Sequence, residues 1–302
     1  MKVGIVGAGA VGTACLFAMA LRGSAREIVL VNRNNERARG VIADLQYGAI
    51  LAPAVSLRPG DYDDLRGAEI VMLTAGANEK TGGATDRNDP AGRLRLLATN
   101  ATVYEDIVPR IVAAAPDALL LIITDPPDPL ADVARRISGH DRVLSSGTFL
   151  DSLRFRFHLG KTLGVDPKSV EAQVVGEHGT SQVYLWSTAR VAGTVIAPDD
   201  AIRHEVENDV RYANISIIEG TGASQLGIGV VAARIAEMIG RNEDAVVPIG
   251  SYQESFGVTL SLPSRVGRDG VTKVLMPTLA EDEARALEES AATLRQALRS
   301  LE

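Results

Sequence analysis

His178 is the one of four histidines whose surroundings in the sequence suit catalysis. It lies in the segment GEHGTS, directly after an apolar run and between glycines, so its imidazole can face a cleft. Upstream, the segment GTFLDSLRFR places Asp151 and Arg154 three residues apart, on one face of an expected helix. Reversible hydride transfer to a 2-oxo acid needs an imidazole, a carboxylate that orients it and an arginine that grips an anion.

A glycine-rich turn near the start of the chain predicts the partner of that chemistry. Gly7, Gly9 and Gly12 follow an apolar run directly and open a helical pattern. This spacing suits the tight turn, the approach of a pyrophosphate and its binding at the helix N-terminus. The next apolar run ends in Asn32 and Arg33, where an acid would bond the adenosine ribose. We therefore expect NAD, with NADP possible because Arg33 could attract a 2′-phosphate.

Two patterns of apolar residues surround these groups. In the first half, short apolar runs alternate with helical patterns, which predicts a Rossmann-type doubly wound parallel sheet, an α/β fold. The expected strands are 3–6, 28–31, 70–74, 119–123 and 143–144. The second half predicts an α+β catalytic domain with helices 150–163, 199–218, 224–239 and 281–301 and strands 170–175, 183–191, 258–263 and 271–276. We expect a dinucleotide-binding domain at 1–145 and a substrate domain at 146–302.

The composition excludes several other classes of protein. The 302 residues are 46% hydrophobic and 23% charged, which is typical of a soluble globular chain. A net charge of −7 offers nucleic acid no broad basic face. The single cysteine, Cys15, cannot form an internal disulfide, and no Cys/His spacing indicates a metal site. The first strand leaves no room for a signal peptide, and no apolar run is long enough for a membrane span, so we expect a cytoplasmic protein.

Several of these segments together resemble the L-lactate/malate dehydrogenase family, and its lactate branch more closely. The resemblance runs nearly end to end, and its most specific parts are GTFLDSLRFR and GEHGTS, together with the GAGAVG start and PSRVGRDGVTKVL near the C-terminus. It implies an NAD(P)-dependent oxidoreductase that transfers a hydride between a nicotinamide and an (S)-2-hydroxy acid/2-oxo acid pair. It also implies a homotetramer or a homodimer.

The resemblance implies a role for each matching residue. His178 would give and take the proton, Asp151 would orient it, and Arg154 would clamp the substrate carboxylate. Arg93 matches the loop arginine that polarises the substrate carbonyl, and Arg87 is its rival. The other matching positions are a substrate contact at Ser224 and cofactor contacts at Val11, Tyr62, Thr74, Gly76, Ala77, Asn100 and Thr124.

Three departures from the family pattern bear on cofactor and substrate. Asn32 stands where the family has an aspartate. Asp125 stands where the family has an asparagine that donates to the substrate oxygen, and an ionised carboxylate cannot donate. Asp125 is therefore held protonated, meets a cationic group, or leaves the donor role to another residue. The segment 76–92, an expected lid, is longer than in the family and places Glu79 at the substrate-selecting position, where the lactate branch has glutamine and the malate branch arginine.

Three functions stay open at this point. A lactate-type enzyme would act on pyruvate, on a larger monocarboxylic 2-oxo acid, or on a substrate that bears an amino or other polar group. Malate dehydrogenase-type activity is less favoured, because the added carboxylates would repel the second charge of oxaloacetate. A dinucleotide-binding sensor with impaired catalysis is the third alternative. The long loop could also turn Glu79 away and present Lys80 or Arg87 instead.

Overall fold

The protein is built around one nine-stranded sheet with the order β14-β13-β12-β6-β5-β4-β1-β2-β3. The computed structural model describes residues 1–89 and 91–301, and Pro90 of the expected lid lies outside them. The parallel strands are β1 (Lys2–Val6), β2 (Glu27–Val31), β3 (Ser56–Gly60), β4 (Ile70–Leu73), β5 (Leu119–Ile122) and β6 (Val143–Ser145). The antiparallel strands are β12 (Ala245–Gln253), β13 (Val258–Gly267) and β14 (Gly270–Val274). The α/β fold class is confirmed.

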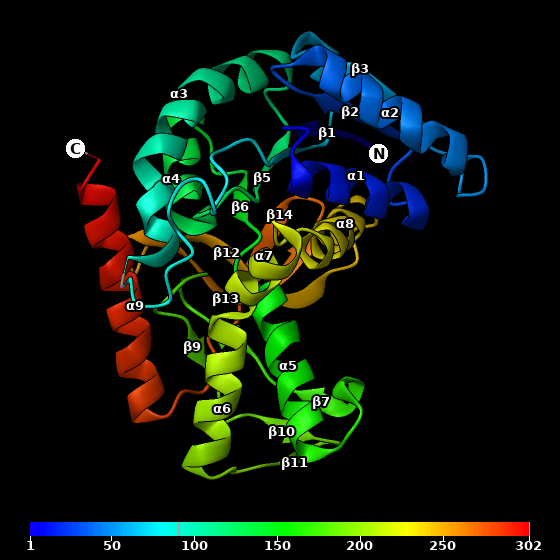
Figure 1. Ribbon diagram of the computed structural model, residues 1–302. Coiled ribbons are helices and arrows are strands. Elements are labelled where there is room, and N and C mark those ends of the chain that lie inside the picture. Colours follow the sequence, from blue (N-terminus) through cyan, green and yellow to red (C-terminus); the bar gives the residue numbers. More distant parts are fainter. Residues whose placement is uncertain (90, 302) are drawn as a thin grey trace.

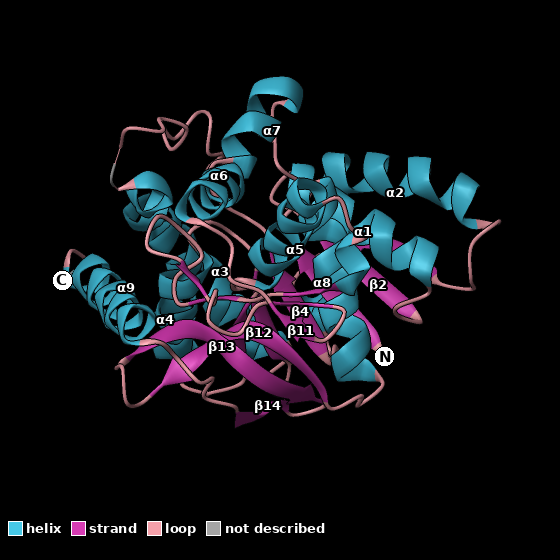
Figure 2. Ribbon diagram, turned by 90° about the horizontal axis from the view of Figure 1, so that it is seen from below, coloured by secondary structure: helices cyan, strands magenta, loops and turns pink. Residues whose placement is uncertain are grey.

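Helices cover both faces of the sheet, as Figures 1 and 2 show. One face packs against α1 (Ala10–Arg22), α2 (Asn35–Ala49) and α8 (Leu226–Gly240). The other face packs against α3 (Leu97–Ala114), α4 (Pro127–Ser138) and α9 (Glu281–Arg299). The remaining helices are α5 (Phe149–Leu163), α6 (Asp200–Arg211) and α7 (Ala213–Thr221), and the small strands are β7 (Val170–Glu171), β8 (Val174–Val175), β9 (Val183–Tyr184), β10 (Arg190–Val191) and β11 (Thr194–Val195).

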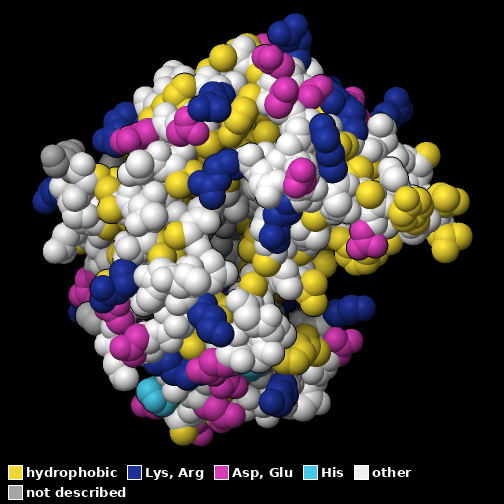
Figure 3. All heavy atoms as spheres, turned by 45° about the horizontal axis from the view of Figure 1, so that its top comes forward, with side chains coloured by type: hydrophobic (Ala, Val, Ile, Leu, Met, Phe, Trp, Pro, Cys, Tyr) yellow, Lys and Arg dark blue, Asp and Glu magenta, His cyan; other side chains and the backbone are white. Residues whose placement is uncertain are grey.

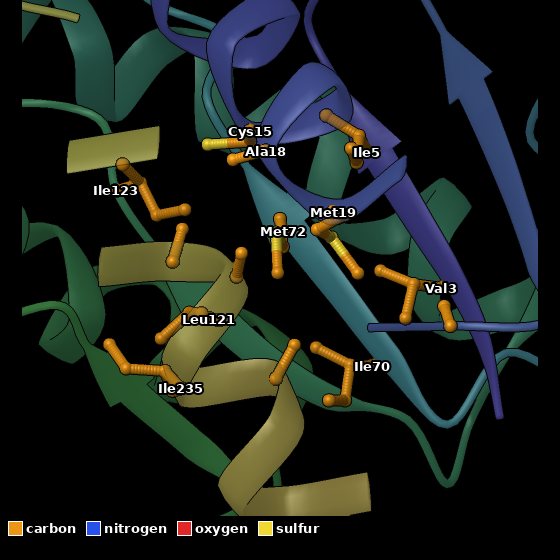
Figure 4. Close-up of a cluster of buried hydrophobic side chains, with 14 of the residues drawn as sticks. Val3, Ile5, Cys15, Ala18, Met19, Ile70, Met72, Leu121, Ile123 and Ile235 are labelled. Atoms are coloured by element: carbon orange, nitrogen blue, oxygen red, sulfur yellow. The ribbon is translucent and has the colours of Figure 1, made fainter. Parts of the chain in front are cut away.

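Side chains of the parallel strands alternate between the two helix layers. Ile70 and Met72 of β4 point toward α1 and α8, together with Leu121 of β5 (Figure 4). Val71, the residue between the first two, belongs to the core on the opposite face. Because both faces are buried, these strands read as continuous apolar runs, which is why their positions were predictable.

The structure corrects three expectations about the second half. The expected helix 199–218 is two helices, because the backbone leaves helical geometry at Tyr212 (φ −102°, ψ 8°). The expected strand 183–191 is two short strands separated by residues 185–189, where the backbone N–H of Ser187 donates to the carboxylate of Glu283 at 2.8 Å. The expected strand 170–175 is likewise two short strands.

The two halves of the chain share the large sheet. β12 joins β6 through the single residue pair Gly250 and Ser145, so the second half extends the parallel sheet of the first. A Cβ atom on Gly250 would lie 1.9 Å from the hydroxyl of Ser145, so the two strands approach more closely than a side chain allows. The domain division at residue 145 stays a prediction.

Neither a membrane span nor a metal cluster was found in the described part of the chain. None of its helices is by itself long and apolar enough to cross a membrane. Only α7 and α8 taken together reach that length and composition, and a bend of 119° lies between them. The described residues also contain no group of three or more His, Cys, Asp or Glu side chains that could hold a metal ion.

Gly229 lies where α8 packs against α1, and it yields a first prediction. A Cβ atom there would lie 2.7 Å from backbone atoms of Ala14 in α1, so the helices would have to separate. We expect Gly229→Ala to lower the free energy of unfolding by about 1–3 kcal/mol, although alanine is intrinsically the better helix former. Urea unfolding followed by circular dichroism measures the change.

Gly227→Ala in the same helix is the matched control. Its Cβ atom would meet only the Leu150 side chain at 3.4 Å, an ordinary contact. We expect this variant to keep or raise the stability, because alanine replaces glycine in a helix without a collision. Equal losses in both variants would contradict the close packing of α1 on α8.

Candidate active site

A cavity of about 160 Å³ opens beyond the carboxyl ends of β1, β4, β5 and β6, with α5, α7 and α8 forming its far wall. β1 and β4 are the neighbours at which the strand order reverses, the place where open α/β sheets bind ligands. The residues lining it that were predicted from the sequence are Gly9, Val11, Thr74, Gly76, Ala77, Glu79, Arg93, Thr124, Asp125, Arg154, His178 and Ser224. Further lining residues are Ala10, Asn78, Ile123, Ser146, Leu150, Asn214, Ala223 and Ile228.

The glycine turn fits the pyrophosphate of a dinucleotide. A Cβ atom on Gly12 would lie 1.9 Å from the carbonyl oxygen of Gly7, so α1 packs directly on the turn. A Cβ atom on Gly9 would meet nothing within 4 Å, which leaves open space beside the start of the helix. Gly9 is also the N-cap of α1 and supplies no side-chain cap. The open space therefore faces helix amides that can bind phosphate oxygens.

Asn32 holds this turn to the end of β2. Its Oδ1 atom accepts a hydrogen bond from the backbone N–H of Ala8 at 2.9 Å, and its Nδ2 atom donates to the carbonyl of Asn34 at 2.9 Å. Arg33 is exposed. Arg37, which sequence reasoning missed, donates from Nε to the carbonyl of Ala8 at 2.5 Å and so reaches across the same turn. Its position in the first turn of α2, four residues after Arg33, was the available signal.

Asn100 braces the two loops that follow β4 and β5. Its Oδ1 atom accepts from the backbone N–H of Ala77 at 2.7 Å, and its Nδ2 atom donates to the carbonyl of Asp125 at 2.6 Å. Thr124 donates to the carbonyl of Ala75 at 2.9 Å and thereby joins the same loops. Tyr62 lies elsewhere: its ring faces the guanidinium of Arg110 at 5.5 Å, and it is absent from the described lining of the cavity.

The buried carboxylate of Asp151 links the imidazole of His178 to the guanidinium of Arg154. Asp151 of α5 is 1% exposed, and its Oδ2 atom contacts Nδ1 of His178. Its Oδ1 atom accepts from Nη1 of Arg154 at 3.0 Å, and Nη2 of Arg154 lies 3.4 Å from the hydroxyl of Ser224. The structure thus brings together the three residues that the sequence placed in two separate motifs, and adds Ser224 beside the arginine.

The charges of His178 and Asp151 stabilise each other. Burial by itself would lower the pKa of His178, but the carboxylate of Asp151 outweighs burial and the nearby Arg93, so the pKa is raised above 6.5. Burial by itself would raise the pKa of Asp151, but His178 and then Arg154 hold it well below its usual range. Each charge therefore favours the charged form of the other group.

Asp128 fixes the backbone of His178. Its Oδ2 atom accepts from the backbone N–H of His178 at 2.6 Å, and its Oδ1 atom accepts from the hydroxyl of Ser145 at 2.5 Å. The side chain is fully buried, and burial raises the pKa of Asp128 to about 7. The sequence motifs had assigned Asp128 no role.

Arg93 lies in the cavity between two carboxylates. Its Nε atom is 3.4 Å from Oε1 of Glu79 and 3.5 Å from Oδ2 of Asp125. Oδ1 of Asp125 is 3.8 Å from Nε2 of His178, and Asn214 of α7 donates to Oε1 of Glu79 at 3.0 Å. Of the three alternatives for Asp125, the structure shows the second, since this carboxylate meets a cationic group. Asn214 was not foreseen, because it comes from the helix break in 199–218.

The rival arginine lies outside the cavity. Arg87 pairs with Glu219 of α7 at 2.7 Å and donates to the hydroxyl of Ser216 at 3.1 Å, and all three are surface groups. Arg93, by contrast, is only 10% exposed. The geometry therefore favours Arg93 as the arginine that meets a substrate, with Arg87 fastening the lid to α7.

Arg93 favours the ionised form of Glu79, a carboxylate that burial disfavours. Burial and then the charge of Asp125 raise the pKa of Glu79, while Arg93 opposes both. Burial would lower the pKa of Arg93, but Asp125 and Glu79 outweigh it and the pKa is raised. Glu79, Arg93 and Asp125 form one network in which the guanidinium is stabilised by both carboxylates and stabilises them in turn.

The proton-transfer pair and both arginines thus share one cavity with the dinucleotide turn. This is the arrangement of an oxidoreductase that moves a hydride to or from a small carboxylic acid.

Comparison with known proteins agrees with this class. The family model for the NAD-binding domain of lactate/malate dehydrogenases matches residues 1–144, and that for their α/β C-terminal domain matches residues 148–302. The chain therefore belongs to the lactate/malate dehydrogenase family, as its motifs indicated.

Individual relatives resemble the chain over its whole length. The L-lactate dehydrogenase of Chloroherpeton thalassium is 41% identical, with 100% of each chain covered, and that of Deinococcus radiodurans is 41% identical over 98% of this chain and 97% of the relative. Among solved structures, a lactate dehydrogenase from a Medee basin deep-sea metagenome library has a TM-score of 0.91 at 32% identity, covering 99% of this chain and 98% of the other.

The shared carboxylate leads to a prediction about proton affinity. Because the folded-state pKa of His178 is raised above 6.5, the stabilising effect of its proton is present below about 6.5 and is lost as the pH rises through the folded value. We expect Asp151→Asn to move the titration of His178 below 6.5, since burial and Arg93 then act unopposed by the carboxylate of Asp151. Proton and carbon NMR of the imidazole C–H groups measures this.

Asp209→Asn serves as the control for that titration. Asp209 lies 3.0 Å from Nδ1 of His158, so this variant also removes a carboxylate from a histidine, but on the outer face of α5 and α6. It should leave the titration of His178 unchanged. A titration of His178 that is the same in Asp151→Asn and in the wild type would contradict the pairing.

Proposed function

We propose that this protein is an NAD-dependent dehydrogenase that interconverts small monocarboxylic (S)-2-hydroxy acids and 2-oxo acids, as the names of its L-lactate dehydrogenase relatives suggest. The observation that carries the proposal is the sharing of Asp151 by His178 and Arg154 in the cavity that the glycine turn enters. Proton transfer and carboxylate binding are thereby placed side by side.

Each residue has one task in the proposed reaction. Arg154 and Ser224 hold the substrate carboxylate, and Arg93 polarises the carbonyl with its terminal nitrogens, because its Nε atom already faces the two carboxylates. His178 gives its proton to the carbonyl oxygen from Nε2, and Asp151 stabilises the imidazolium beforehand. The nicotinamide, when bound, supplies the hydride in reduction and accepts it in oxidation.

The cavity disfavours the alternatives. A dicarboxylic substrate such as oxaloacetate would bring its second charge to a pocket that already holds Glu79 and Asp125, so malate-type activity is not favoured. Loss of catalysis is not favoured either, since the proton donor, its carboxylate and both arginines lie together. The use of NADP beside NAD stays a prediction, supported by Arg33 and now by Arg37 beside the turn.

Replacement of the proton donor tests the proposal. Oxidation of NADH with pyruvate and with larger 2-oxo acids should be lowered at least ~100-fold in kcat by His178→Ala, the low end for loss of general acid–base catalysis. NADH binding, measured by fluorescence titration, should be kept, because the glycine turn is unaffected.

His204→Ala, on the exposed surface of α6, is the control and should behave as the wild type. Wild-type protein that binds NADH but reduces no 2-oxo acid would overturn the proposed function.

We further propose that the enzyme is a homodimer or a homotetramer. Exposed apolar side chains on the neighbouring helices α1 and α8 support self-association. Figure 3 shows further hydrophobic side chains gathered at one edge of the molecule. Phe17 and Leu21 of α1 and Leu226 and Val230 of α8 are each 48% exposed or more.

Light scattering after gel filtration tests the assembly. We expect the wild type to be a dimer or tetramer, and the double variant Phe17→Glu/Val230→Glu to dissociate, because two charges would be buried in each interface. Val195→Glu, at an equally exposed apolar residue of β11, should leave the mass unchanged. A monomeric wild type would contradict this proposal.

We infer a cytoplasmic location from the chemistry of the chain. Cys15 is free and fully buried, and burial raises the pKa of its thiol to about 12, so it is protected and unreactive. A chain with this single thiol is suited to a reducing compartment.

A further inference from the structure

Five side chains follow one another across the cavity. Nε2 of His178 lies 3.8 Å from Asp125, Asp125 lies 3.5 Å from Arg93, Arg93 lies 3.4 Å from Glu79, and Glu79 accepts from Asn214 at 3.0 Å. Glu79 is thus separated from His178 by Asp125 and Arg93, and Asn214 ends the row on its far side. Asn214 anchors Glu79 there, because the donating amide is itself buried on α7.

Glu79 has an oxygen atom to spare. Both of its partners, Arg93 and Asn214, bind Oε1, and Oε2 accepts no hydrogen bond from any residue in the described ranges. The side chain is 14% exposed, and the surface that it exposes lines the cavity. A carboxylate can only accept hydrogen bonds, so this oxygen calls for a donor from the ligand.

The part of the substrate that meets this oxygen follows from the other contacts. Arg154 and Ser224 take the carboxylate of a 2-hydroxy acid, and His178 and Arg93 take the oxygen on C2. The remaining substituent of C2 is the side chain. Glu79 lies beyond Arg93 in the row, so it faces that side chain.

We propose that Glu79 binds a protonated amino group on the side chain, so that the preferred substrates are short amino-substituted (S)-2-hydroxy acids and their 2-oxo counterparts. This proposal rests on the proposed function and names the substrate class of the same site. The amino group takes no part in the reaction: the hydride from C2 goes to the nicotinamide, the hydroxyl proton goes to His178, and the C2 carbonyl forms.

The charge balance of the pocket favours an ammonium group over a methyl group. The carboxylates of Glu79, Asp125 and Asp151 face the guanidinium groups of Arg93 and Arg154 and the imidazole of His178, so the protonated site has no positive charge left over for a further anion. A substrate with an apolar side chain adds a further carboxylate and leaves Oε2 of Glu79 without a partner. An ammonium group offsets the added charge and supplies the missing donor.

Matched pairs of substrates test the proposal in the oxidation direction. (S)-3-Amino-2-hydroxypropanoate is compared with (S)-2-hydroxybutanoate, and (S)-4-amino-2-hydroxybutanoate with (S)-2-hydroxypentanoate, so that each pair differs by an ammonium or a methyl group at one position. With NAD⁺ in excess, we expect wild-type kcat/KM to favour the amino compound of at least one pair by about 100-fold or more, because a site built for a donor rejects the analogue that lacks it.

Two variants assign the preference to the carboxylate. Glu79→Gln keeps the size of the side chain and an oxygen for Asn214 but removes the charge, so the preference should fall at least about 100-fold, largely through KM of the amino compound. Glu205→Gln makes the same chemical change on the exposed surface of α6 and should keep the wild-type preference. Thermal melting of both variants checks that they are folded.

The outcomes separate this inference from the proposed function. Wild-type protein that oxidises (S)-lactate but prefers the methyl compound in both pairs overturns the inference and leaves the proposed function standing. An amino preference that survives in folded Glu79→Gln also overturns it. Wild-type protein that binds NADH and oxidises none of the 2-hydroxy acids overturns the proposed function, and the inference with it.

Discussion

The buried carboxylate of Asp151 is the interaction on which the rest of the site depends. It binds the imidazole of His178 with one oxygen and the guanidinium of Arg154 with the other, so the proposed proton donor and the proposed carboxylate clamp share one anchor. Its helix is fixed by the next residue: the hydroxyl of Ser152 accepts from the backbone N–H of Val174 at 2.9 Å. Val174 belongs to the short strand that leads to His178, and the two motifs are therefore held in register by the chain between them.

Much of the fold could be predicted because burial on both faces leaves a simple mark in the sequence. The five expected parallel strands are all present, since continuous apolar runs have few other interpretations in an α/β chain. β3 and β12 could not be found in this way, because Pro59 with Gly60 and Pro248 with Gly250 interrupt their patterns. The break at Tyr212 was equally hidden, since the helical periodicity continues across it.

The site was predictable where chemistry lies within one segment and unpredictable where it depends on distant partners. Motif spacing led to His178, Asp151 and Arg154, which the structure brings together. The partner of Asp125 could not be deduced, because Arg93 reaches it from a different loop and the sequence does not show how the segment between β4 and α3 folds. Asn214 could not be predicted either, because its position depends on the break between α6 and α7.

Gly250 contributes no functional group, yet it lies against the carboxylate that holds the backbone of His178. A Cβ atom there would lie 2.7 Å from Oδ1 of Asp128 and closer still to Ser145, and the other oxygen of Asp128 holds the backbone of His178. This seam, the pairing of β6 with β12 that joins the two halves of the chain, therefore lies next to the residues that hold His178. In evolutionary terms, the halves cannot drift or be exchanged independently: a descendant that acquires a larger residue at this seam must reshape both sides of it at once. The residue that can be inherited at position 250 is therefore limited by its neighbours Ser145 and Asp128, although Gly250 itself has no chemical role.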